Sequence, residues 1–329
     1  MGLHTRPAGT LRFLVMAPTL ATPPILSIPH PLRPSRRRSG ERVAVGLLGL
    51  CAFLTVATTA VIVGVLVTDA VRFFRVVGIV EFLTGTEWTA LFTNPKFGVL
   101  PLLSGTVLVA AGAMVIALPL GVATAIYLSE YAPRRVRTVL KPTLELLAGI
   151  PTVVFGYFAL NFVTPHILRP IFGDDTPVFN AAAAAVVVGL MTLPTISSLT
   201  EDAFSAVPDS LREAAYGLGA GKRIVALRVI VPAALSGIGS ALLLGISRAV
   251  GETMAVAIAA GATPNLTWNP LESIQTMTGF IAQVGSGEAP TGSIEYKAIF
   301  AVGFTLFVVT LAFNMVSQRV VRRYRQVYQ

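Results

Sequence analysis

The sequence contains few of the side chains that build metal sites and catalytic sites. It has one cysteine and three histidines among 329 residues, so no disulfide can form within the chain and no cysteine metal cluster is expected. Cys51 lies inside an apolar run, and His4, His30 and His166 are scattered without the spacing of metal ligands. No cluster of nucleophile and base stands out either, so we expect neither a metal site nor enzyme activity in this chain.

Charge is also scarce. Only 12% of the residues are charged and 54% are apolar, whereas a typical soluble domain is about 25% charged. The chain is therefore predicted to be an integral membrane protein whose surroundings are lipid. A net charge of +9 could indicate nucleic acid, but nucleic-acid-binding proteins gather basic residues on one soluble face. Here the basic residues flank apolar runs, so we expect no nucleic-acid partner.

Six apolar runs are long enough to cross a bilayer, which takes about 20 residues. The runs are continuous rather than alternating, which favours helices over the strands of a barrel. The predicted fold class is all-α, a polytopic membrane protein with six transmembrane helices. The runs cover residues 43–67, 100–128, 144–167, 178–199, 233–262 and 298–317.

Basic residues predict which side of the membrane each connection occupies, because cytoplasmic loops are enriched in Lys and Arg. Most of them fall in the N-terminal tail, in residues 134–141, in residues 212–228 and after residue 319. The other side has only Arg72, Arg75, Lys96, Arg169 and Lys297. Both chain ends are therefore expected in the cytoplasm, and Glu130 and Glu145 are expected at the membrane surface or paired with residues 134–141.

The chain divides into two predicted regions. Residues 1–42 are rich in proline and arginine and lack a long apolar run, so we expect a disordered basic cytoplasmic tail, within which Met16 is a second possible start. Residues 43–329 form the transmembrane domain, with a cytoplasmic loop at about 200–232. In the first outer connection Trp88 suits either a docking surface or an anchor at the membrane interface.

The cytoplasmic loop has the pattern of two short helices joined by a turn. Polar residues alternate with Ala214, Ala215 and Leu218 before the turn, which is typical of a helix at a protein surface. Glycines at 217, 219 and 221 tolerate positive φ and permit a sharp turn. Residues 217–222, GLGAGK, superficially suggest a phosphate-binding loop, but the spacing and the following Arg223 do not fit one. We expect no ATP to bind to this chain.

Residues 213–232, EAAYGLGAGKRIVALRVIVP, resemble the coupling loop of the ABC importer permeases. The matching positions are Glu213, Ala214, Ala215, Gly219 and Pro232, whereas Val229 and Val231 stand where that family usually has Ile and Leu. The resemblance implies a type I ABC importer permease fold in which this loop forms two short helices around a glycine turn and docks on an ATPase subunit. ATP would then be bound by the partner subunits.

Further segments resemble the C-type permease family (PstC) of high-affinity phosphate importers. They are residues 97–106, FGVLPLLSGT, residues 119–121 and 125–131, and residues 145–157, ELLAGIPTVVFGY. The assignment to the C-type depends on residues 88–106. The resemblance implies a permease of the bacterial cytoplasmic (inner) membrane that pairs with a second homologous permease. The implied partners are two ATPase subunits, an extracytoplasmic phosphate-binding protein docked on residues 69–96 and 264–295, and inorganic phosphate.

Two charged residues lie inside the fifth run. Arg248 and Glu252 are four residues apart, so we expect them on one face of a helix. Charges within the membrane usually face a cavity or a partner. One interpretation is a structural ion pair. The other is that Arg248 binds phosphate oxygens in transit while Glu252 keeps Arg248 charged without occupying it permanently.

Other functions are compatible with parts of this pattern. A permease for another oxyanion, such as sulfate or molybdate, would share the coupling loop but should lack the pattern at 145–157. An ion-coupled secondary transporter would import its substrate alone, without ATP. An enzyme embedded in the membrane would need a catalytic cluster, which is not apparent in the sequence.

Overall fold

The computed structural model describes residues 38–324, and the side chains of residues 40–319. The chain divides into two units, Met1–Thr59 and Ala60–Gln329. The described part of the first unit is the beginning of helix α1, Arg38–Phe74. This helix starts within the predicted tail, so residues 38–42 are helical and not disordered. Residues 1–37, the remainder of that tail, lie outside the described residues.

The second unit continues α1 and consists of helices and connecting loops. The α-helices are α2 Ile79–Thr84, α3 Leu100–Ile126, α4 Arg134–Ala148, α5 Thr152–Phe158, α6 Arg169–Phe172, α7 Ala181–Ser205, α8 Asp209–Gly217, α9 Lys222–Ile224, α10 Val231–Ala233, α11 Leu235–Gly251, α12 Met254–Ala260, α13 Met277–Gln283 and α14 Ile294–Tyr324. Four segments are π-helical: η1 Tyr127–Tyr131, η2 Ala159–Leu168, η3 Val225–Ile230 and η4 Val284–Glu288. Within residues 38–324 no strand is longer than the isolated bridge between Trp88 and Phe97, which confirms the all-α class.

Four helical segments are long and apolar enough to cross a membrane unbroken: Gly40–Phe74, Leu100–Tyr131, Ala181–Ser205 and Ile294–Arg319. Two further spans are bent pairs. Arg134–Ala148 and Thr152–Phe172 meet at 88°, and Lys222–Ala233 and Leu235–Gly251 meet at 70°. The six predicted runs therefore correspond to four unbroken helices and two bent pairs. The number of membrane spans is six if each bent pair crosses the membrane once.

The third and fifth runs are not the uninterrupted helices that their hydrophobicity indicated. The third breaks between Ala148 and Thr152, where Pro151 takes an extended ψ of 135°; proline has no N–H to continue the helix and restricts the residue before it. The fifth breaks at Ala234 and again at Glu252, which has an extended ψ of 129°. These three breaks leave backbone groups that other parts of the protein must satisfy.

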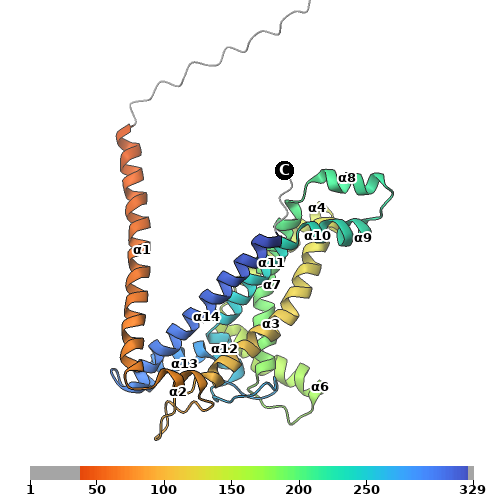
Figure 1. Cartoon of the computed structure of the whole chain (residues 1–329). Helices are drawn as coiled ribbons and strands as arrows, with labels where there is room; N and C mark the ends of the chain where they lie inside the picture. Colours follow the sequence, from red (N-terminus) through yellow and green to blue (C-terminus); the bar gives the residue numbers. More distant parts are fainter. Residues whose placement is uncertain (1–37, 325–329) are drawn as a thin grey trace, which may run out of the picture. The chain divides into compact units, whose positions relative to one another are not determined.

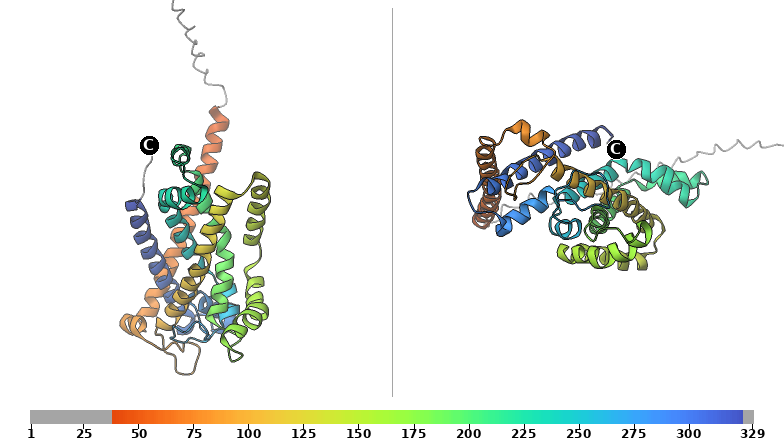
Figure 2. Two further views of the ribbon diagram at one scale, coloured as in Figure 1. Left: turned by 90° about the vertical axis from the view of Figure 1, so that its right-hand side faces the viewer. Right: turned by 90° about the horizontal axis from the view of Figure 1, so that it is seen from below.

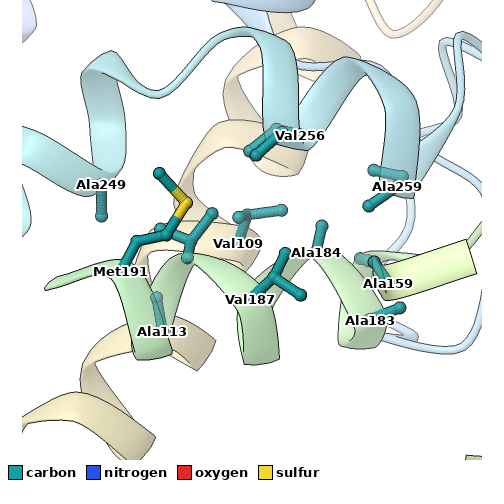
Figure 3. Packing of buried hydrophobic residues seen from close by; sticks show 14 of the residues in the cluster. Val109, Ala113, Ala159, Ala183, Ala184, Val187, Met191, Ala249, Val256 and Ala259 are labelled. Atoms are coloured by element: carbon teal, nitrogen blue, oxygen red, sulfur yellow. The ribbon is translucent and has the colours of Figure 1, made fainter. Parts of the chain in front are cut away.

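Helix α7 is at the centre of the bundle and packs mainly against α3 and α11. Figure 3 shows Met191, Val187 and Ala184 of α7 facing Ala249 at the end of α11 and Val256 and Ala259 of α12. Small residues permit the close approach of these helices, as is common in membranes. A Cβ on Gly121 of α3 would lie 2.7 Å from Ile196 of α7.

A second core lies at the opposite end of the unit from α8. Its aromatic centre contains Phe73, Phe82, Phe97 and Phe280 around Trp88, whose ring lies 4.8 Å from that of Phe280. Trp88 is only 2% exposed. The predicted role of Trp88 at a docking surface or as an interfacial anchor is therefore wrong: its buried ring packs the connection between α2 and α3 against α13.

The segments rich in Lys and Arg gather at one end of this unit. Figure 1 shows α8, α9, the beginning of α4 and the end of α14 at one end, and α2, α6 and α13 at the other. The left view of Figure 2 shows the same grouping from the side. The residues predicted to be cytoplasmic, Arg134 to Lys141 and Arg212 to Arg228, thus lie on elements that share one end.

Candidate functional site

The first candidate site is the coupling segment, defined here as residues 209–234, which comprises α8, a turn, α9, η3 and α10. Glu213 and Ala214 are exposed on α8, and Pro232 is exposed on α10. Ala215 faces inward and packs with Leu211 against a buried cluster. That cluster contains Ala125, Phe204, Val207, Val225, Ile230 and Ala234. The predicted coupling residues therefore lie on one folded segment, with Glu213 and Ala214 available to a partner.

The turn of the coupling segment depends on Gly219. Its φ is +80°, whereas Gly217 and Gly221 do not have positive φ. Gly219 N–H donates to the Tyr216 carbonyl at 2.9 Å, and Ala220 N–H donates to the Ala215 carbonyl at 3.1 Å. These bonds satisfy carbonyls at the end of α8, in the manner of a glycine cap. The expectation of a glycine turn between two short helices is confirmed, and it requires glycine at one of the three positions.

Arg212 connects α8 to the rest of the bundle. Its Nη1 and Nη2 donate to the backbone carbonyls of Val207 and Phe204, each at 2.7 Å. Nη2 also lies 3.4 Å from Glu130 Oε1 on η1, and Nη1 lies 3.0 Å from Asp209 Oδ1. Of the two alternatives for Glu130, pairing with residues 134–141 is wrong, because its carboxylate pairs with Arg212.

A separate cluster holds α4 against α7. Glu201 on α7 has a side chain that is 1% exposed, and it pairs with Arg137 and with Lys141, whose Nζ lies 3.0 Å from Glu201 Oε2. Sequence reasoning missed Glu201 because it lies two residues beyond the fourth apolar run. The available signal was an acidic residue at the end of a span, together with the basic residues of the connection at 134–141.

The second candidate site is on α11. Ser240, Leu244, Arg248 and Gly251 are exposed, and their spacing places them on one stripe of the helix. Among residues 40–319, whose side chains the structure describes, Arg248 forms no ion pair. The guanidinium thus lies on a face of the membrane-spanning helix that no other part of the described chain covers.

Glu252 does not share a helix face with Arg248, contrary to the prediction. Helix α11 ends at Gly251, and Glu252 has an extended backbone. Its Oε1 accepts from Ala255 N–H at 3.3 Å, and its carbonyl accepts from the Thr278 hydroxyl at 2.8 Å. Glu252 therefore braces the break between α11 and α12, because the freed backbone groups there need partners.

A cavity of about 270 Å³ lies beyond this break, beside α12 and α13. Met254, which follows the break, contributes to its wall together with Gln275, Gln283 and Glu288. Gln275 Nε2 donates to Gln283 Oε1 at 2.6 Å, and Gln283 Nε2 donates to Glu288 Oε2 at 2.7 Å. The cavity therefore has a small cluster of hydrogen-bonded polar side chains in a largely apolar wall.

Comparison with known protein families assigns the chain to one of them. Residues 117–326 match the family described as "Binding-protein-dependent transport system inner membrane component". The chain belongs to this family. The matched region includes the coupling segment, Arg248 and Glu252, and the described spans fit a multi-pass protein of the inner membrane. This chain is accordingly a transport subunit rather than an enzyme, a permease of the ABC importer type.

Similar proteins among the curated relatives carry related names. The probable ABC transporter permease protein YqgH of Bacillus subtilis is 36% identical over 265 residues, which cover 80% of this chain and 85% of that protein. The phosphate transport system permease protein PstC of Mesorhizobium japonicum is 32% identical, covering 74% and 78%. PstC 1 of Mycobacterium tuberculosis is 33% identical, covering 78% and 86%.

Solved structures share the fold of this permease at low sequence identity. A bacterial ABC transporter that imports the acidic polysaccharide alginate has a chain with a TM-score of 0.60 and 14% identity, covering 88% of this chain and 98% of that chain. The same transporter in complex with an alginate pentasaccharide-bound periplasmic protein gives a TM-score of 0.61 at 17% identity, covering 87% and 98%. These matches support the type I importer permease fold and carry no substrate assignment.

Proposed function

We propose that this permease is the membrane-spanning subunit of an ATP-driven phosphate importer and forms the translocation path with a second homologous permease. The observation that carries the proposal is the exposed guanidinium of Arg248 on α11, which forms no ion pair within residues 40–319. The names of the relatives support phosphate as the substrate.

The position of Arg248 favours an aqueous path over a lipid-facing surface. A charge near the centre of a membrane costs about 2.5 to 3.5 kcal/mol even on lenient insertion scales, so the exposed stripe of α11 should face the second permease or a water-filled space. The guanidinium presents paired donors that match the oxygens of phosphate. Arg248 is therefore proposed to bind phosphate in transit, with Glu252 beside the path as the brace of the helix break.

The coupling segment is proposed to dock on the ATPase subunits, two of which would serve the paired permeases and bind ATP. Glu213 is exposed on α8, and Leu218 in the turn is 90% exposed. Tyr216 and Ile224 add exposed apolar surface at 43% and 48%. An apolar patch on an extramembrane segment is typical of a protein interface. Ala214, Ala215, Gly219 and Pro232 would shape this surface, and no cofactor is proposed for the permease itself.

The orientation is proposed to place both chain ends in the cytoplasm and the aromatic core at the outer side. Helix α14 ends at the same end of the unit as α8 (Figure 1). Phe73, at the end of α1, lies in the opposite, aromatic core, and α1 has 37 residues, enough to cross once. An extracytoplasmic phosphate-binding protein would then meet the outer connections within residues 69–96 and 264–295.

Purification and reconstitution test the proposed function. Mild solubilisation should recover the permease with an ATPase and a second permease of similar size. Vesicles containing this complex and the binding protein should take up radiolabelled phosphate only when ATP is present. Preferential uptake of sulfate or molybdate would contradict the phosphate assignment. Uptake by the purified chain without ATP would instead indicate an ion-coupled transporter.

The orientation yields a separate prediction. Reporter fusions placed after Arg325 and within residues 129–140 should both report a cytoplasmic location, because basic segments are retained on that side. A fusion near Gly287, which lies in η4 before α14, should report an extracytoplasmic location. A cytoplasmic signal from the Gly287 fusion would contradict the proposed orientation.

A further inference from the structure

Three structural elements meet at the side chain of Arg212, which is only 16% exposed. The residue belongs to α8. Its guanidinium donates to the carbonyl of Phe204 in the last turn of α7 and to that of Val207 just after this helix, and it pairs with Glu130 on η1. Since η1 directly continues α3, one planar group links the coupling segment to the two helices that pack most extensively in the bundle.

The two carbonyl contacts restrict how α8 can move relative to α7. Carbonyls in the last turn of a helix lack partners within that helix, and the negative end of the helix dipole favours a cation. The donors of a guanidinium have a fixed planar arrangement. A tilt of α8 must therefore either carry the end of α7 along or break hydrogen bonds to a charged group.

The contact to Glu130 extends this link to the cytoplasmic end of α3. The Glu130 side chain is 9% exposed, and its Oε1 also accepts from the Ser129 hydroxyl at 3.0 Å. A mostly buried carboxylate that loses its cation is left without compensation. Displacement of Arg212 should therefore disturb η1 directly, without passing through the exposed surface of α8.

The folding of the coupling segment has a different basis. Leu211 and Ala215 of α8 pack against the buried cluster that includes Phe204, Val225 and Ile230. The turn is closed by backbone hydrogen bonds around Gly219. Because neither feature uses the guanidinium, removal of Arg212 should leave α8 folded and its outer surface, including Glu213 and Leu218, available to a partner.

We propose that Arg212 is a positioning residue that transmits the movement of α8 to α7 and α3 during transport. The proposal rests on the proposed function, because it requires an ATPase that moves the coupling segment. Arg212 acts through the ends of these helices rather than through contact with nucleotide or phosphate. Its loss should uncouple ATP hydrolysis from transport rather than prevent assembly.

The test compares variants of the complete importer, reconstituted with its ATPase and binding protein. For Arg212→Gln we expect normal copurification of the ATPase, a normal rate of ATP hydrolysis, and phosphate uptake per ATP lowered about tenfold, the effect of losing hydrogen bonds to one charged group. Arg212→Lys should fall between Arg212→Gln and wild type, since an ammonium keeps the charge but cannot span both carbonyls.

A double-mutant cycle examines the link to η1. Glu130→Gln should lower uptake per ATP less than Arg212→Gln does, and the double variant should be no worse than Arg212→Gln alone, because both changes break the same contact. Arg135→Gln is the matched control. It removes an exposed arginine of α4 at the same end of the bundle and should leave phosphate uptake per ATP unchanged.

Two results would overturn the role of Arg212. One is an unchanged uptake per ATP in Arg212→Gln, and the other is a loss of uptake that only follows a loss of bound ATPase, which would show a role in assembly. The proposed function fails differently, in the wild type. If the wild-type complex transports another oxyanion, the phosphate assignment fails, and the role of Arg212 is tested by uptake of that ion per ATP. A wild-type chain that recruits no ATPase contradicts both proposals.

Discussion

Replacement of Arg248 by glutamine is expected to lower phosphate uptake by roughly 100-fold while the complex still assembles and hydrolyses ATP. Glutamine keeps a polar amide but loses the charge and the paired donors that suit phosphate oxygens. Hydrogen bonds to charged groups contribute about 1.5 to 3 kcal/mol each, so losing them at the path accounts for an effect of this size. The measurement is ATP-dependent uptake of radiolabelled phosphate into vesicles, with ATP hydrolysis recorded in the same sample.

Two further variants separate phosphate binding from a structural role. Arg248→Lys keeps the charge but not the paired, planar donors of the guanidinium, so it should retain only part of the wild-type uptake. The double variant Arg248→Gln/Glu252→Gln should remain inactive, because the structure has no bridge between these residues and Glu252 instead accepts from Ala255 N–H. Recovery of uptake in the double variant would show a structural pair and contradict the proposed contact with phosphate.

Replacement of Gly219 by valine is expected to abolish most transport by deforming the coupling turn. Gly219 has a φ of +80°, a conformation in which a β-branched residue is a rare outlier. Strained backbone of this kind costs about 1 to 3 kcal/mol, which corresponds to a loss of roughly fivefold to 150-fold in the population of the native turn. Uptake and ATPase copurification should fall together, while the amount of permease in the membrane stays the same.

Gly221→Val is the matched control for this prediction. A Cβ at either position has no heavy atom within 4 Å, so crowding does not distinguish the two glycines. Gly221 has a φ of −75°, which a side chain tolerates, and the effect of this variant should be much smaller. Equal damage by both substitutions would show that the backbone conformation of Gly219 is not the cause. Normal transport by Gly219→Val would contradict the role of the turn.

The sequence alone was sufficient for the features that local chemistry dictates. Long apolar runs must form helices in lipid, since only helices and closed barrels satisfy the backbone there. The resemblance of Glu213, Gly219 and Pro232 to a family pattern indicated the coupling segment, the glycines there predicted a turn, and the structure confirms a positive φ at Gly219. These properties depend on residues close together in the chain, so they can be predicted from the sequence without the structure.

The helix breaks could be seen in part. Pro151 marks the bend in the third span, because proline cannot continue the hydrogen bonds of a helix. The break at Glu252 has no such mark: Arg248 and Glu252 have the spacing of one helical face, yet the chain leaves the helix between them. The Thr278 hydroxyl and the Glu252 side chain satisfy the backbone at that point. A contact across 26 residues decided this conformation.

Only the tertiary structure decided the partners of the buried charges and of the large aromatic side chains. Glu130 has basic residues four to eleven positions away in the sequence, but its partner is Arg212, 82 residues further along. Trp88 has the amphiphilic character of an interfacial residue, but it is enclosed by the rings of Phe82 on α2, Phe97 and Phe280 on α13. Pairing and burial depend on which elements meet in space, and residue type fixes only what each side chain can do once they meet.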